Sequence, residues 1–260
     1  MGGIVTTGPH TEYPGITQTE DAAGNARYLG EIVNNSNRVA CNIGVSINSY
    51  DASGVLLTNP GNQQFGFANL LGETFRFSSS TTQTMENCLS PGHRASFDIR
   101  NDFPLMTGQN PPVPHVAWIE ASTTCDGVLF DGCASPQPPN GQPFAYPVAV
   151  LGIEGSVTEG VDGLGHVVYT GTVRNKSLTG AAPTYHVKIV FTARNAAGLV
   201  TDVACATIDG PECPVPQGST PANTGLGPGD SWMFSVPLSI PPSETCSGCF
   251  SYIINQKPSL

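Results

Sequence analysis

Eight cysteines are the residues of this sequence best suited to chemistry. Along the chain they form four successive pairs: Cys41 with Cys88, Cys125 with Cys133, Cys205 with Cys213, and Cys246 with Cys249. Eight cysteines allow 105 pairings, so the sequence alone does not fix the connectivity. Pairing between neighbours is the most economical arrangement, because loops 126–132 and 206–212 contain Gly or Pro that let a short loop close. We therefore predict disulfide bonds and an oxidising compartment.

The closest cysteines stand in the motif Cys246-Ser247-Gly248-Cys249. This spacing is used by redox-active pairs, by half of a zinc site and by structural disulfides. A redox pair needs a helix N-terminus to lower the pKa of one thiol, whereas this motif precedes a predicted strand. A zinc site needs two further ligands, which Cys205 and Cys213 could supply. A structural disulfide is the favoured interpretation, and the other two stay open.

Other catalytic and metal-binding patterns are missing from the sequence. The five histidines lie far apart, and no His-x-x-x-His spacing, Gly-x-Ser-x-Gly elbow or phosphate-binding Gly-x-x-x-x-Gly-Lys motif occurs. Asp126 and Asp131 come close together in one small loop, but a calcium loop needs more oxygen ligands at set spacing. Solvated turn residues are the better interpretation of this pair. We predict no enzymatic activity, no cofactor and no metal.

Composition and charge narrow the class of protein further. The 260 residues include 30 Gly and 23 Pro, which argues against a mainly helical fold, because both residues destabilise helix interiors. The net charge is −10 with only 10 Lys and Arg, so a nucleic-acid partner is not expected. The longest apolar run, residues 147–151, is far shorter than the roughly 20 residues of a membrane-spanning helix. Residues 1–4 lack the basic start of a signal peptide.

Three blocks of sequence occur twice, in the same order. Residues 28–36 match residues 169–177, and residues 43–58 match residues 187–201. In the third block, Leu-x-Pro-Gly occurs at residues 89–92 and 226–229, followed by an aromatic and an aliphatic residue two positions apart. The spacing between the copies varies only where loops are expected, and loops tolerate insertions. The chain is therefore interpreted as a duplication.

Each copy has the pattern of β-strands joined by tight turns. Apolar residues alternate with polar or small ones at Ile43, Val45 and Ile47, which is typical of a half-buried strand. Asp-Ala-Ser-Gly and Asn-Ala-Ala-Gly predict hairpin turns in which Gly54 and Gly198 take a positive φ. Short strands with turns about every ten residues predict an all-β chain made of two antiparallel β-sandwiches.

The predicted organisation has four parts. Residues 1–26 form an N-terminal extension, residues 27–122 the first sandwich and residues 148–260 the second. Residues 123–147 combine a disulfide loop with a run rich in proline, which predicts a semi-rigid, extended spacer.

The repeated motifs resemble the FxLYD-type immunoglobulin-like domain. The matching positions in the first copy are Gly30, Ile32, Asn34, Tyr50, Asp51, Gly54, Leu89, Pro91, Gly92 and Phe97, and in the second Gly171, Val173, Asn175, Asn195, Gly198, Leu226, Pro228, Gly229 and Phe234. Arg194 stands where the family has Tyr before the turn. The resemblance implies immunoglobulin-like sandwiches in an envelope or secreted protein, and it carries no catalytic residues.

Two asparagines fit the acceptor pattern for N-glycosylation. Asn34 and Asn175 occupy equivalent turns of the two copies. Asn is also favoured where a turn needs a positive φ, and this conformational explanation is preferred, with a glycan as the alternative.

Without catalytic residues, interaction is the expected function. We predict a secreted or cell-surface structural protein that self-associates through sheet edges. The expected assembly is an extracellular filament or layer. Ile4, Val5, Thr6 and Thr7 form a β-branched run that could add a strand to an open sheet edge. The alternative is a ligand- or glycan-binding adhesion module, which needs exposed aromatic residues. Trp118 and Trp232 bear on this choice, and Trp232 shares a predicted face with Phe234 and Val236, which favours a core position for it.

Overall fold

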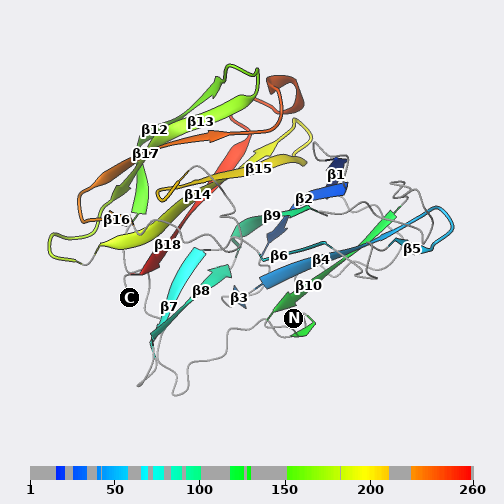
Figure 1. The fold of residues 1–260 in the computed structure, drawn as a ribbon, viewed down its shortest axis with the longest axis horizontal. Helices are drawn as coiled ribbons and strands as arrows, with labels where there is room; N and C mark the ends of the chain where they lie inside the picture. Colours follow the sequence, from blue (N-terminus) through cyan, green and yellow to red (C-terminus); the bar gives the residue numbers. More distant parts are fainter. Residues whose placement is uncertain are drawn as a thin grey trace. The chain divides into compact units, whose positions relative to one another are not determined.

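The fold was analysed in a computed structural model of the chain (Figure 1). It describes residues 16–20, 26–33, 40–41, 43–57, 66–69, 73–78, 83–89, 92–100, 118–125, 128–129, 151–181, 183–210 and 224–258. Within these residues the secondary structure consists of strands β1 to β18 and a single turn of 3-10 helix, η1, at Pro242–Glu244. Every pairing with a determined register is antiparallel, so the all-β prediction is confirmed.

The chain divides into two compact units. The first comprises residues 1–70 and 88–135, and the second comprises residues 71–87 and 136–260. The proline-rich segment lies outside the described residues, so its predicted role as a spacer stays a prediction. The division into four parts proposed from the sequence likewise stays a prediction.

The first unit contains two sheets. One has the strand order β1 (Thr17–Glu20), β2 (Ala26–Val33) and β9 (Arg94–Arg100). The other places β4 (Ile43–Tyr50) between β10 (Trp118–Cys125) and the short strands β5 (Leu56–Leu57) and β6 (Gly66–Asn69). Strand β11 (Val128–Leu129) pairs with the other side of β10. The two-residue β3 (Ala40–Cys41) pairs with residues 88 and 89 at the end of β8 (Gln83–Leu89). The rest of β8 and its other partner, β7 (Glu73–Ser78), belong to the second unit.

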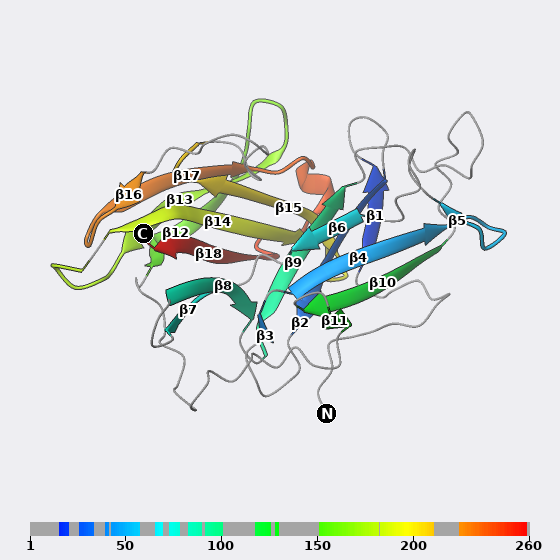
Figure 2. The same ribbon diagram turned by 60° about the horizontal axis from the view of Figure 1, so that its bottom comes forward.

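The second unit also contains two main sheets (Figure 2). One has the order β12 (Leu151–Val161), β13 (Val167–Asn175) and β17 (Ser231–Pro237). The other places β14 (Thr184–Arg194) between β15 (Val200–Thr207) and β18 (Phe250–Pro258), with β16 (Gly225–Leu226) pairing at the start of β14.

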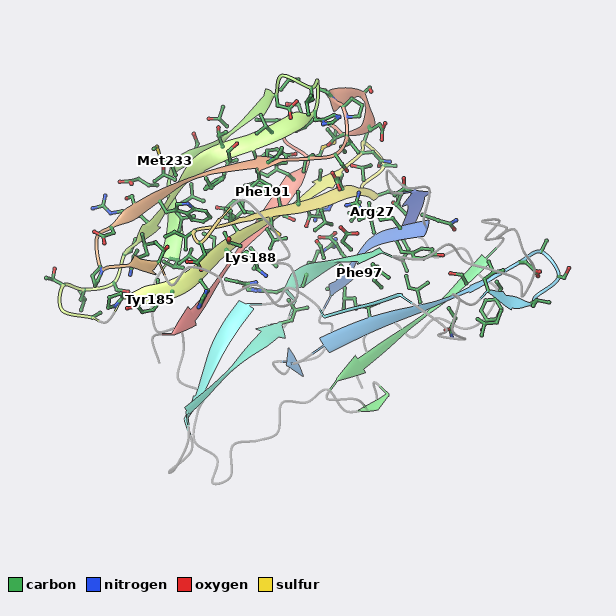
Figure 3. The ribbon with its side chains drawn as sticks, viewed as in Figure 1. Arg27, Phe97, Tyr185, Lys188, Phe191 and Met233 are labelled. Atoms are coloured by element: carbon green, nitrogen blue, oxygen red, sulfur yellow. A yellow bond between two sulfur atoms is a disulfide. The ribbon has the colours of Figure 1, made fainter. Side chains whose placement is uncertain are left out.

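The core of the second unit is formed by the facing sides of its two sheets. Its fully buried members are Val167, Tyr169, Val173, Val187, Ile189, Phe191, Ala193 and Val236. The ring of Phe191 stacks on that of Tyr169 with 4.7 Å between their centres, and lies among the core side chains, whereas Met233 on the outer face is 82% exposed (Figure 3). The alternation predicted from the sequence therefore holds on β17.

The register of the sheets repeats between the two units. Gly30 lies opposite Phe97 in the pair β2–β9, and Gly171 lies opposite Phe234 in the pair β13–β17. Each glycine also follows a fully buried tyrosine by two positions, at Tyr28 and at Tyr169. The same contacts at matching positions support the duplication inferred from the sequence.

The two predicted hairpin turns are confirmed and have the same hydrogen bonds. Gly54 and Gly198 have φ values of +79° and +81°. The Asp51 side chain accepts hydrogen bonds from the amides two and four residues later, and the Asn195 side chain does the same. A third turn of this kind joins β12 to β13. The Asp162 side chain accepts hydrogen bonds from the amides two and four residues later, and Gly165 has the positive φ. This third turn is not among those predicted from the sequence.

Candidate functional site

Strand β18 and its exposed apolar side chains are the candidate site of the second unit. Strand β18 lies beside β14 and runs from the hairpin turn at residues 195–199, as β10 lies beside β4 next to the turn at residues 51–55. In the first unit, β11 pairs with the far side of β10. Among the strands described in the second unit, β18 is hydrogen-bonded to β14 alone. No strand described in the second unit is hydrogen-bonded to β18 as β11 is to β10, although β7 of that unit lies against β18.

The side chains of β18 show that the core is open at this edge. Phe250, Tyr252 and Ile254 lie opposite Ala193, Phe191 and Ile189 of β14. Phe250 and Ile254 pack against the core, and the Tyr252 ring lies 5.7 Å from the ring of Phe191. The β14 residues are fully buried, whereas Tyr252 is 42% exposed and the other two β18 residues are half-buried. The row of apolar side chains therefore continues onto β18, and β7, which lies against β18, leaves Tyr252 partly exposed.

The edges of the opposite sheet differ from that of β18. A bulge between Glu154 and Thr158, where Gly155 has a φ of +76°, interrupts the pairing of β12 with β13. Bulges of this kind discourage the addition of another strand. Strand β17 is regular, but its core-facing Phe234 and Val236 are already buried. Strand β18 differs from both, because it has core-facing side chains that are only partly buried.

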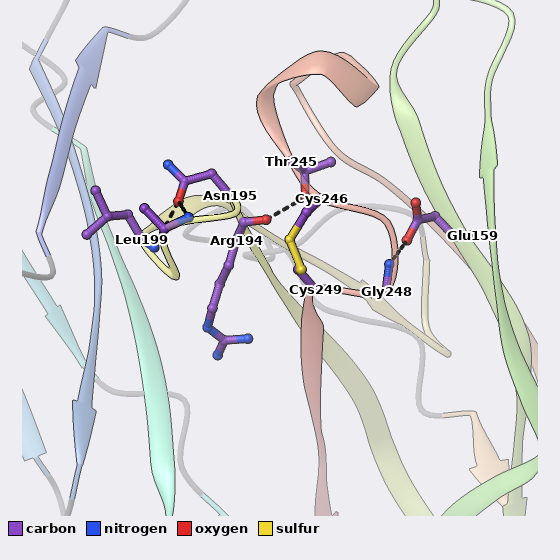
Figure 4. The surroundings of a disulfide bond; sticks show 9 residues. Glu159, Arg194, Asn195, Leu199, Thr245, Cys246, Gly248 and Cys249 are labelled. Carbon is purple, nitrogen blue, oxygen red and sulfur yellow. Dashed lines mark hydrogen bonds between the residues drawn. A yellow bond between two sulfur atoms is a disulfide. The ribbon is translucent and has the colours of Figure 1, made fainter.

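A disulfide bond fixes the chain just before β18. Cys246 and Cys249 are bonded, with their Cα atoms 5.2 Å apart (Figure 4). The Arg194 carbonyl accepts hydrogen bonds from the Cys246 amide and from the Thr245 hydroxyl, and the Arg194 amide donates to the Cys249 carbonyl. These hydrogen bonds join the disulfide-closed turn, residues 246–249, to Arg194 at the end of β14. The disulfide and its surroundings thus set where β18 begins.

The three cysteines whose side chains are described are all disulfide-bonded. They are Cys205, Cys246 and Cys249. Sulfurs in disulfide bonds offer no thiolate, so this state does not favour the zinc and redox alternatives for the Cys-x-x-Cys motif. Cys41 and Cys88 lie directly opposite each other in the pair β3–β8, a backbone placement that suits the predicted bridge. Cys125 ends β10, while Cys133 and Cys213 lie outside the described residues.

Replacing both Cys246 and Cys249 with Ser should loosen the start of β18. In the chain-entropy account, opening a loop this short costs about 2 kcal/mol of stability. We expect faster hydrogen exchange at residues 245–250, measured by mass spectrometry. Ser247→Ala, in the same turn and exposed, is the matched control and should leave the exchange unchanged. Equal exchange in the double variant and the control would show that the disulfide does not hold this edge.

Two equivalent tyrosines have different hydrogen bonding. The Tyr28 hydroxyl hydrogen-bonds to Ser49 on the facing sheet, whereas the buried hydroxyl of Tyr169 has no partner among the described residues. Burial raises the pKa of both phenols to about 12, and the bond to Ser49 offsets part of the rise for Tyr28. For Tyr169 the charges of Glu159 and Asp202 add to the rise and the nearby Thr245 side chain offsets a small part of it, without a hydrogen bond of ordinary geometry. Both side chains are therefore neutral in the folded protein at ordinary pH.

Removing these two hydroxyls should have opposite effects on stability. Tyr28→Phe leaves Ser49 without its partner and should cost about 1 kcal/mol. Tyr169→Phe removes a buried polar group that lacks a hydrogen bond, so it should be neutral or stabilise the second unit by up to about 1 kcal/mol. Hydrogen exchange in increasing urea measures each unit separately. A loss of stability in Tyr169→Phe as large as that in Tyr28→Phe would contradict the assignment.

The raised phenol pKa values predict instability at alkaline pH. The unfolded tyrosines ionise near pH 10, but the folded ones ionise only near pH 12. The contribution to stability is therefore complete below pH 10 and is lost as the pH rises from 10 to 12, because deprotonation then favours the unfolded chain. Urea midpoints measured between pH 8.5 and about 11.5 should fall across this range. The variant carrying both Tyr28→Phe and Tyr169→Phe should show a shallower fall.

The conformational explanation for Asn175 is correct only in part. Asn175 does not have a positive φ, since His186 is the sole non-glycine residue with one among those described. Instead, its buried side chain donates to the Leu226 carbonyl and accepts from the Ser177 amide. A buried amide nitrogen cannot carry a glycan in the folded unit. Asn34 lies outside the described residues, so the question stays open there.

Of the remaining residues singled out in the sequence, some lie outside the described residues and others are placed by the structure. Ile4, Val5, Thr6 and Thr7 lie outside the described residues, as do Asp126 and Asp131. Trp232 is half-buried and packs against Phe234, with 6.2 Å between ring centres. No cluster of three or more metal-ligating side chains occurs in the described part of the chain. The same part contains no helix with the length and apolar character needed to cross a bilayer.

Comparison with known proteins does not assign the chain to a family. Neither the models of protein families nor the curated proteins contain a match to the chain. The function is therefore inferred from the strands, turns and disulfide of the two units.

Proposed function

We propose that this chain is a non-catalytic structural protein of the cell surface or the extracellular space that self-associates through its sheet edges. Strand β18, which among the described strands is hydrogen-bonded to β14 alone and has Tyr252 42% exposed although β7 lies against it, carries this proposal. An edge strand with unpaired backbone groups is a template for pairing with another chain. The surfaces are poor in charge, at 12% of residues, which lowers the cost of burying them against other subunits.

The finer fold and the compartment belong to the same proposal. The repeated Gly–Phe register and the repeated hairpin turns support two immunoglobulin-like sandwiches of the FxLYD type. The disulfide-bonded Cys205, Cys246 and Cys249 support a location outside the cytoplasm, because disulfides persist in oxidising compartments.

The alternative function, a glycan-binding or other adhesion module, has weaker support. A sugar-binding face needs exposed aromatic side chains on which a sugar ring can stack. Trp232 is half-buried against the core, and Tyr252, at 42%, is the single exposed aromatic side chain among those described, so they offer no group of stacking residues. Self-association is therefore the preferred proposal.

Self-association can be tested on the intact, oxidised protein. Sedimentation velocity over a wide concentration range, together with electron microscopy, should reveal multimers that grow with concentration. Deleting residues 1–12 should give a monomer with an unchanged far-ultraviolet circular dichroism spectrum. If the full chain stays monomeric at all concentrations, the proposed function is wrong.

A further inference from the structure

We propose that residues 71–87, here called the arm, cover the edge of β18 and so limit its pairing with other chains. The arm contains β7 and the first part of β8, and it belongs to the second unit, where β7 lies against β18 (Figure 2). This inference rests on the proposed function and deepens it, because it names what regulates the edge through which copies would associate.

The sequence of β18 explains why its edge needs a cover. Residues 250–256 contain no acidic or basic residue, no proline and no glycine, and four of them are aromatic or branched aliphatic. Uncharged segments with such high β-propensity pair readily with other chains when they lie at an uncovered edge. Among the described strands, β18 is hydrogen-bonded to β14 alone, and β7 is a strand that lies against it.

The contact between β7 and β18 is held less firmly than a regular strand pair. In the described part of the chain, β7 is hydrogen-bonded to β8 and β18 to β14, but no ladder of hydrogen bonds joins β7 to β18. Opening this contact therefore leaves the pairings of β14 with β15 and with β18 intact. The cover is also incomplete, since Tyr252 stays 42% exposed. The arm can thus leave β18 while the second unit keeps its own sheets.

The course of the chain fixes both ends of the arm. Residues 70 and 88, which flank it, belong to the first unit. At its base, Cys41 and Cys88 lie directly opposite each other in the pair β3–β8, which suits the predicted disulfide bridge. The arm is therefore fastened at both ends in a different unit from the one whose edge it covers. Because these ends stay in place when the arm leaves β18, the cover can close again.

The edges of the opposite sheet are protected in other ways. A bulge with Gly155 at a positive φ interrupts β12, and β17 ends in Pro237 with its core-facing side chains already buried. In contrast, residues 250–255 of β18 pair with β14 without a bulge. The arm thus takes the place of a bulge or a proline at this edge.

Opening the arm in the full, oxidised chain tests the cover. The variant Phe75→Pro/Arg76→Pro has proline at two successive positions of β7, whose amides point to opposite edges, so one of the two breaks the pairing with β8. At low protein concentration, amide exchange in β18 should be at least about threefold faster than in the native chain. Exchange in β13 and β17 should not change. Unchanged exchange in β18 would overturn the cover.

A milder variant guards against general unfolding. Phe75→Ser/Phe77→Ser removes two aromatic residues that lie on one face of β7, and it introduces no proline. If the proline variant also speeds exchange in β13 and β17, the same comparison is made with this variant. Faster exchange confined to β18 supports the cover, and exchange equal to that of the native chain overturns it.

Self-association then tests what the cover prevents. In sedimentation velocity, the arm variant should form multimers at a concentration about tenfold lower than the native chain, as expected if the arm covers β18 in about nine of ten molecules. Adding Tyr252→Lys should reverse this effect, because a charge on an edge strand discourages pairing. Adding Met233→Lys instead, at an 82% exposed position of β17, is the matched control and should leave the multimers unchanged.

The outcomes separate this inference from the proposed function. A native chain that assembles at the same concentration as the arm variant, or at a lower one, would overturn the cover but leave self-association intact. A native chain that stays monomeric while the arm variant assembles would support the cover and contradict the proposed function. Monomers in both would overturn both proposals. Reversal by Met233→Lys as strong as that by Tyr252→Lys would overturn the choice of edge.

Discussion

Replacing Asp202 with Ala is expected to destabilise the second unit by about 3 to 5 kcal/mol. Asp202 is 1% exposed, on β15, and its carboxylate joins the two sheets. It accepts hydrogen bonds from the Val203 amide at 2.9 Å, the Ser239 amide at 2.6 Å and the Ser239 hydroxyl at 2.8 Å. The alanine variant loses all three bonds and leaves buried donors without partners, which costs more than the bonds contribute in the native protein.

The loss should be measured by hydrogen exchange in increasing urea, on peptides from β14 and β15. This readout isolates the second unit in the intact chain. Ser239→Ala removes only the hydroxyl donor and should cost about 1 kcal/mol. Asp202→Asn keeps one acceptor oxygen and should fall between the two variants. A loss below 1 kcal/mol in Asp202→Ala would show that the carboxylate does not join the sheets.

Local features of the fold were predictable because their signals lie within a few residues. The hairpin turns at Gly54 and Gly198 depend on an Asp or Asn side chain three residues before a glycine with positive φ. The same spacing occurs at Asp162 and Gly165 and would have identified the third turn. Strand alternation also placed Phe234 and Val236 correctly on the core side.

Features that depend on distant residues were not predictable in this way. Asp202 has no local signal, since its partner Ser239 lies 37 residues away and an isolated acidic residue in a strand suggests an exposed position. Asn175 was assigned a positive φ, whereas its side chain is held by the Leu226 carbonyl, 51 residues away. In both cases a long-range hydrogen bond decides the role of a residue whose neighbours suggest a different one.

The candidate edge illustrates the same limit. The sequence predicts a last strand in each copy, and β10 and β18 confirm both. The partner beyond that strand, however, is a property of how strands are ordered in a sheet. The two-residue β11 has no periodicity that a sequence could reveal. In the described part of the second unit no strand is hydrogen-bonded to β18 on that side, and β7 lies against β18, a difference that becomes apparent only when the two sheets are compared.

Replacing Gly171 with Ala is expected to cost about 2 to 3 kcal/mol, through overpacking of the core. A Cβ atom at this position would lie 2.7 Å from Cζ and 3.1 Å from Cε1 of Phe234. That ring cannot move away freely, because it is buried between Phe191 and Trp232, whose ring centres lie 5.6 Å and 6.2 Å from it. Gly160→Ala is the matched control in the same sheet, since its nearest contact would be an ordinary 3.6 Å to Val168.

A double-mutant cycle with Phe234→Leu identifies the source of the cost. Leu lacks the atoms that the new Cβ meets, so Gly171→Ala should be better tolerated in that background by roughly 1 kcal/mol or more. Simple additivity would show that the ring is not the obstacle. Because Gly30 lies opposite Phe97 in the same register, Gly30→Ala should destabilise the first unit in the same way. Hydrogen exchange in urea would then show each substitution weakening its own unit, as expected if the duplication kept this glycine–aromatic contact in both copies.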